Sequence, residues 1–133
     1  MKRLEMHTFV KRNIVKRVKD IAATVSSAGV CDGSEENGFF TRAELEYCAG
    51  RLRCLGARLM IKECVFDYLA SESGPVVRNY REIEITNDEF RKPMLRLRCG
   101  PKECADRLRI KDILITLSHS RAWIAGMVLF CYY

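Results

Sequence analysis

A long apolar pattern in the middle of the chain constrains the fold more than any other feature. In Arg58–Leu69 several pairs of apolar side chains lie three or four residues apart, and neither Gly nor Pro occurs before Gly74. This spacing places the apolar side chains on one side of an α-helix. We therefore predict a helix from about Ala57 to Ala70 with one buried face.

The same segment carries a small cluster of charged side chains. Arg58 and Lys62 lie four residues apart, and Glu63 follows directly. On a helix they occupy adjacent faces, close enough to share one polyanionic ligand and its metal ion. Charges on a helix are more often its solvated side. The cluster alone therefore leaves both interpretations open.

Length and composition indicate one globular domain over residues 1–133. Of the 133 residues, 48% are apolar and 30% are charged, which is typical of soluble proteins. No run of 18 apolar residues occurs, so we expect no membrane span. The N-terminus lacks the pattern of a signal peptide, and we expect a cytoplasmic protein.

The net charge of +6 favours an acidic partner. No helix-turn-helix, zinc-finger or RNP pattern accompanies it, so we expect no DNA or RNA ligand. The seven cysteines form no C-x-x-C pair, and His7 and His119 are the two histidines. This composition excludes the usual zinc spacings and favours reduced thiols.

The N-terminal arm, residues 1–19, is strongly basic. Apolar residues recur at helical spacing along it and beyond, at Val10, Ile14, Val18, Ile21 and Val25. We predict an amphipathic helix that packs on its own domain. A helix that binds anionic lipid, an acidic protein or nucleic acid, or that serves as a targeting segment, remains an alternative.

The remaining elements follow from local signals. Residues 26–38 contain turn formers and predict a loop. Thr41 and Glu44 have the spacing of a capping box, which begins a helix that ends near Gly50. A short helix is expected over Cys104–Leu108.

Alternating apolar residues predict two antiparallel hairpins. The first joins the strands around Ile83–Ile85 and Leu95–Leu97, and the second joins Ile110–Leu117 to Trp123–Phe130. The predicted fold class is α+β, with an antiparallel sheet and packed helices.

Five blocks of sequence, in order, resemble the holo-acyl-carrier-protein synthases, the short phosphopantetheinyl transferases. The blocks are Phe40-Thr41 with Glu44-Leu45 and Tyr47-Cys48, Arg58 with Lys62-Glu63, Tyr80 with Ile83-Glu84-Ile85, Lys92-Pro93 with Leu95 and Leu97, and Leu117-Ser118-His119. They correspond to the family patterns F-T-x-x-E-L-x-Y-C, R-F-x-x-K-E-A, aromatic-x-D-I-E-I, G-K-P-x-L-x-L and S-L-S-H.

The resemblance implies a phosphopantetheinyl transferase-like fold and a defined reaction. The family transfers the 4′-phosphopantetheine group of coenzyme A to a serine of an apo acyl carrier protein, which is small and acidic. Adenosine 3′,5′-bisphosphate is released. Mg²⁺ is the implied cofactor, and a homotrimer with sites between protomers is the implied assembly.

The resemblance also assigns roles to individual residues. Glu63 is implied as a metal ligand and as a catalytic residue with Lys62, and Asp20 as the second metal ligand. The implied contacts to coenzyme A are Arg58, Lys62, Lys92, Pro93, Ser118 and His119.

Two positions depart from the family pattern. Asp67 stands where relatives carry a lysine one helical turn after the glutamate, and Arg91 replaces the glycine before Lys-Pro. A divergent enzyme and a catalytically silent homologue that binds carrier proteins are both consistent with these changes. A basic nucleic-acid or membrane-surface protein acting through residues 1–19 is the third hypothesis.

Overall fold

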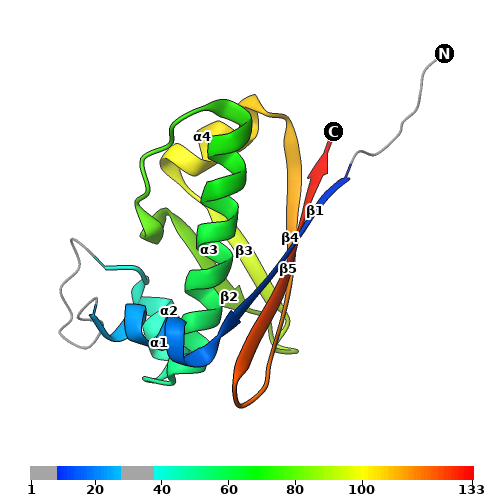
Figure 1. Ribbon diagram of the computed structural model, residues 1–133. Helices are drawn as coiled ribbons and strands as arrows, with labels where there is room; N and C mark the ends of the chain where they lie inside the picture. Colours follow the sequence, from blue (N-terminus) through cyan, green and yellow to red (C-terminus); the bar gives the residue numbers. More distant parts are fainter. Residues whose placement is uncertain (1–8, 28–37) are drawn as a thin grey trace.

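A computed structural model describes residues 9–27 and 38–133 (Figure 1). The elements in order are β1 (Phe9–Arg17), α1 (Val18–Ser27), α2 (Arg42–Cys48), α3 (Leu52–Ser73), the 3-10 turn η2 (Tyr80–Glu82), β2 (Ile83–Asn87), β3 (Pro93–Leu97), α4 (Cys99–Arg107), β4 (Ile110–His119) and β5 (Trp123–Tyr132).

Two antiparallel sheets carry the fold. The larger one has the strand order β1-β5-β4, and β2 and β3 form a separate hairpin. Figure 1 shows the helices on one side of the larger sheet, with α3 running along its length. The predicted α+β class and both predicted hairpins are confirmed.

Helix α3 is the centre of the core. Both clusters of buried apolar side chains include residues of α3, one with β2 and α4 and the other with α1 and α2. The helix passes close to β5 at Gly126, where an added Cβ would lie 2.9 Å from Ile61 Cδ1. The predicted helix over 57–70 is confirmed, and it extends to Leu52 and Ser73.

The prediction of a helix in the N-terminal arm is wrong for residues 9–17. They form β1, which pairs with β5 from Phe9↔Cys131 to Arg17↔Trp123. Val10 and Ile14 lie four apart, which suits a helix, but an even spacing also places them on one face of a strand. The open edge of β5 decides between the two, because it supplies hydrogen bonds that the local sequence does not encode.

This correction weakens the hypothesis of a free basic helix, because residues 9–17 are part of the sheet. Residues 1–8 and most of the predicted loop, 28–37, lie outside the described residues. The helix expected through Asp20 does occur, as α1, and the first turn of that helix contains Asp20. No helix within 9–27 or 38–133 is long and apolar enough to cross a membrane.

The other local predictions agree with the structure, with two changes. The capping box of Thr41 and Glu44 is present at the start of α2. Helix α4 begins at Cys99, earlier than expected, since Pro101 is tolerated in a first helical turn. Cys48 and Cys54, predicted to be reduced, are joined by a disulfide across the α2–α3 turn.

Candidate functional site

Lys62 lies in the interior and has no donor free for a substrate. Its side chain is fully buried, and Nζ donates hydrogen bonds to Glu44 Oε1 at 2.6 Å and to two backbone oxygens, Phe39 O at 2.7 Å and Tyr80 O at 3.1 Å. An ammonium has three donors, so all are used. Burial lowers the pKa of Lys62, and the Glu44 carboxylate opposes this shift.

The catalytic and phosphate-binding roles of Lys62 stay predictions, and in this structure its ammonium bonds within the chain. Lys62 and Glu63 lie on adjacent faces of α3, as predicted. The Lys62 side chain is buried, whereas the Glu63 side chain is partly exposed beside Lys16. The hydrogen bonds of Lys62 connect α3 to α2 through Glu44 and to η2 through Tyr80. Its function in the structure is to position α3.

Glu44 completes this buried network. Its Oε1 also accepts the backbone N–H of Thr41 at 2.9 Å, and its Oε2 accepts that of Ile85 at 2.8 Å. The capping-box carboxylate thus connects α2, α3 and β2. The sequence predicted the cap but gave no sign of its contact with a lysine 18 residues away.

Arg58 is also nearly buried, with 3% of its surface exposed. Its guanidinium donates to Asn87 Oδ1 and to Cys54 Sγ, and lies 4.8 Å from the centre of the Tyr47 ring. Burial lowers the pKa of Arg58. Its Nε is buried without a hydrogen-bond partner.

Glu63 faces the N-terminal strand. Its side chain is 29% exposed, and Oε1 lies 3.7 Å from Lys16 Nζ. Among the described residues no hydrogen bond or ion pair joins Asp20 to Glu63, and no group of three or more His, Cys, Asp or Glu side chains could hold a metal ion. The pairing of Asp20 with Glu63 at one metal ion stays a prediction.

Mg²⁺ takes one or two carboxylates, retains waters and completes its coordination with substrate phosphates. A single accessible carboxylate is compatible with this chemistry, and Glu63 meets the requirement. Asp20 is exposed in the first turn of α1.

Asp67 is paired with a cation from the loop after α3. Arg78 Nη2 lies 2.5 Å from Asp67 Oδ1, and this hydrogen bond raises the pKa of Arg78. The guanidinium also lies 5.6 Å from the centre of the Phe66 ring. The negative charge at this departure from the family pattern is therefore neutralised within the chain.

A cavity of about 370 Å³ lies between β1 and the turns of α3 that follow Glu63. Its lining residues are Arg12, Asn13, Ile14, Cys64, Asp67, Tyr68 and Ser71. The Arg12 guanidinium lies 5.2 Å from the centre of the Tyr68 ring. Polar residues of β1 therefore lie beside the helix that carries Glu63. The sequence analysis missed this neighbourhood, because it predicted a helix in place of β1.

His119 contributes to a second cavity, of about 450 Å³, at the N-terminal end of α3. The other lining residues are Val18, Ala22, Arg51, Leu52, Arg53 and Cys54. Two arginines and a histidine thus surround one cavity, beside backbone N–H groups that a helix N-terminus leaves free. No side-chain cap at Arg51 occupies them.

Arg51 and Arg53 differ in how they are held. Arg51 donates to the carbonyl oxygens of Cys48 and Tyr47, both at 2.8 Å, and Arg53 donates to Arg121 O at 3.1 Å. The sequence analysis missed both residues. Both precede the predicted start of the helix at Ala57, so the helical pattern gave no signal for them. The tertiary structure places them at one cavity with His119, at the end of β4.

The other predicted coenzyme A contacts do not line this cavity. Ser118 is an exposed residue of β4 opposite Ala125. Lys92 is exposed in the β2–β3 turn, and Pro93 begins β3. Arg91 adopts a left-handed conformation with φ of 66°, so the turn forms without the family's glycine.

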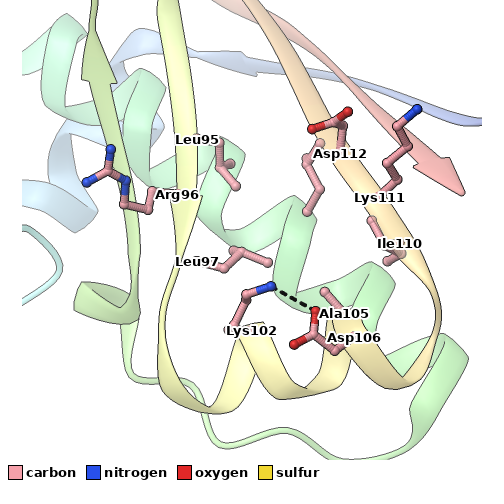
Figure 2. A pocket seen from close by; sticks show the side chains of 10 residues that line it. Leu95, Arg96, Leu97, Lys102, Ala105, Asp106, Ile110, Lys111 and Asp112 are labelled. Atoms are coloured by element: carbon pink, nitrogen blue, oxygen red, sulfur yellow. Dashed lines mark hydrogen bonds and ion pairs between the residues drawn. The ribbon is translucent and has the colours of Figure 1, made fainter. Parts of the chain in front are cut away.

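A third cavity, of about 270 Å³, lies between β3, β4 and α4 (Figure 2). Apolar and charged side chains line it in equal number, among them Leu95, Leu97 and the Lys102–Asp106 ion pair. None of the predicted site residues lines this cavity.

Solved structures identify the class of fold. An acyl carrier protein synthase of Chronobacterium ammoniagenes superimposes with a TM-score of 0.72 at 21% identity, covering 96% of this chain and 99% of that one. The holo-[acyl-carrier-protein] synthase of Helicobacter pylori, solved with coenzyme A, gives 0.67 at 15% identity, covering 91% and 99%. The chain has the acyl carrier protein synthase fold.

Sequence comparison identifies the family, although no family model matches. The holo-[acyl-carrier-protein] synthase of Dehalococcoides mccartyi strain CBDB1 is 38% identical over 92 residues, which are 69% of this chain and 75% of the relative. That of Moorella thermoacetica is 33% identical over 93 residues, 68% and 71%. The chain belongs to the holo-[acyl-carrier-protein] synthase family, as its motifs predicted.

Proposed function

We propose that this protein transfers the 4′-phosphopantetheine group of coenzyme A to a serine of an apo acyl carrier protein. The observation that carries the proposal is the basic cavity at the N-terminus of α3, on the same helix as the accessible carboxylate of Glu63. Family membership and solved neighbours that contain coenzyme A support it.

The nucleotide end of coenzyme A binds in the cavity beside His119. Arg51 and Arg53 offer guanidinium groups to a phosphate, and the first N–H groups of α3 add to the positive potential. Ser118 directly precedes His119 in β4 and so lies next to the nucleotide end of coenzyme A. Arg58 adds positive charge from within the protein, where its guanidinium is buried.

The reaction joins the carrier's serine oxygen to the phosphorus that bears the pantetheine arm. The bond from that phosphorus to the bridging oxygen breaks, and adenosine 3′,5′-bisphosphate leaves with the electron pair. The serine proton passes to Glu63, which acts as general base. Phosphoryl transfer needs mainly positioning and charge neutralisation, so few protein groups are required.

Mg²⁺ would neutralise negative charge on the diphosphate, and Glu63 is the side chain that would hold it. Asp20, the second ligand that the resemblance implies, would have to approach from α1. The Lys62–Glu44 pair acts indirectly, because it fixes the orientation of α3.

We also propose self-association through the outer face of the larger sheet, as a homotrimer by analogy with the family. Figure 1 shows no helix on this face. It carries Trp123, Ala125, Met127 and Leu129 of β5, flanked by Phe9, Val15 and Leu114, of which the last three are each more than half exposed. A strand that is apolar on both faces is typical of one buried on both sides.

Assembly would bring parts of one protomer to the site of another. Lys92, in the β2–β3 turn, and Pro93, at the start of β3, line neither the cavity beside His119 nor the one beside β1. We propose that they contact the adenine side of coenzyme A in a neighbouring protomer. The net charge of +6 suits the acidic carrier protein, and the proposed compartment is the cytoplasm.

The test is incubation with coenzyme A, Mg²⁺ and an apo acyl carrier protein, followed by mass spectrometry of the carrier. A mass gain of one phosphopantetheine group supports the proposal. An unmodified carrier that still co-elutes with the protein favours the catalytically silent homologue. Asp67, which stands in place of the lysine of the family pattern, is the observation that favours this second candidate.

A further inference from the structure

The inner face of β1 presents cations to α3. Every second residue points the same way along a strand, so Val10, Arg12, Ile14 and Lys16 share one face. Val10 and Ile14 pack against the core, Arg12 lies over Tyr68, and Lys16 pairs with Glu63. The strand contains no Asp or Glu.

The backbone of Lys16 is firmly placed. Lys16 pairs with Ile124, a fully buried residue of β5, and α1 begins two residues later, where Val18 N donates to Ala122 O at 2.8 Å. The side chain is 40% exposed, so its ammonium is accessible to a ligand. Because the backbone of Lys16 is fixed and its ammonium is accessible, the ammonium can move from Glu63 to a ligand without a change in the strand.

The ion pair with Glu63 is weak enough to be exchanged. At 3.7 Å, with both side chains partly exposed, it contributes little in water. A diphosphate carries more negative charge than one carboxylate and so competes for the ammonium. Asp67 and Arg78 neutralise each other, and Lys16 is paired with Glu63.

We propose that Lys16 binds the diphosphate of coenzyme A, and that Glu63 holds its ammonium until the substrate arrives. This inference rests on the proposed function. When Lys16 moves to the diphosphate, Glu63 loses its cationic partner. The chain therefore binds coenzyme A without a divalent ion, using its own cation.

The test is calorimetric titration of coenzyme A in EDTA and then in Mg²⁺. The wild-type protein binds in EDTA, and Lys16→Ala lowers the affinity there about tenfold, as expected for a lost charge-assisted contact. Lys16→Arg retains the affinity. Lys11→Ala is the matched control, since it removes the same charge from an exposed residue of the same strand and leaves the affinity unchanged.

Glu63→Gln gives a second, independent readout. It releases Lys16 from its ion pair, so affinity in EDTA equals or exceeds that of the wild type, whereas a tenfold loss overturns the proposal. Equal affinity of Lys16→Ala and Lys11→Ala also overturns it. Binding that requires Mg²⁺ refutes the Lys16 role and leaves the transferase intact, while no binding in either buffer refutes the transferase itself.

Discussion

Replacement of Lys62 by Met tests the structural role that the buried network assigns to it. Methionine keeps much of the volume of the lysine stem but removes the ammonium. Glu44 then remains buried with its charge, and its hydrogen bonds from Thr41 N and Ile85 N do not replace the lost cation.

Removal of one partner from a buried ion pair costs about 3–5 kcal/mol. For a domain of this size that loss lowers the melting temperature by roughly 10–20 °C. Denaturant unfolding monitored by circular dichroism measures the loss of free energy, and thermal unfolding measures the change in melting temperature. Lys102→Met is the matched control, because Lys102 also has a carboxylate partner, Asp106 at 2.8 Å, but both side chains are more than half exposed. We expect a far smaller loss of stability there, because water screens an exposed ion pair.

The double variant Lys62→Met with Glu44→Gln separates the pair from the packing. Without an unpaired buried carboxylate, part of the lost stability returns. If Lys62→Met costs no more than Lys102→Met, the ion pair does not hold α3, and the functional role first expected for Lys62 becomes tenable again.

Four further predictions concern the site, the disulfide and the assembly. Glu63→Gln abolishes carrier modification while the circular dichroism spectrum is unchanged, and equal turnover would remove Glu63 from the mechanism. Arg53→Ala raises KM for coenzyme A about tenfold with little change in kcat, since it removes one charged phosphate contact; an unchanged KM would exclude the cavity. Cys48→Ser lowers unfolding free energy by about 2 kcal/mol for so short a loop, measured against the oxidised wild type, and no loss would argue against the bridge. Val15→Glu reduces the oligomer to monomers in light scattering, whereas Lys11→Ala, a control on the same strand, does not.

Local patterns were sufficient to predict several elements. The apolar spacing of Arg58–Leu69 predicted α3, because a helix buries one face at that period whatever it packs against. Thr41 and Glu44 predicted the start of α2 for a similar reason, since a capping box is satisfied within four residues. The two hairpins followed from alternation between turn residues.

The N-terminal strand was beyond the reach of local reasoning. Val10 and Ile14 suit either a helix or a strand, and β5, more than a hundred residues later in the chain, decides. The same holds for the cavity beside His119, where Arg53 is brought to the end of β4 by tertiary packing.

The sequence by itself determined the family, the α+β class and the helix that carries Glu63, because short-range periodicity and ordered motifs encode them. Only the tertiary structure decided which charges are buried and which can meet a ligand. Lys62 and Glu63 are neighbours in the chain, yet the packing of α2 and β2 encloses one and the strand β1 leaves the other accessible. Burial is a property of long-range contacts, and adjacent residues of a helix face different ones.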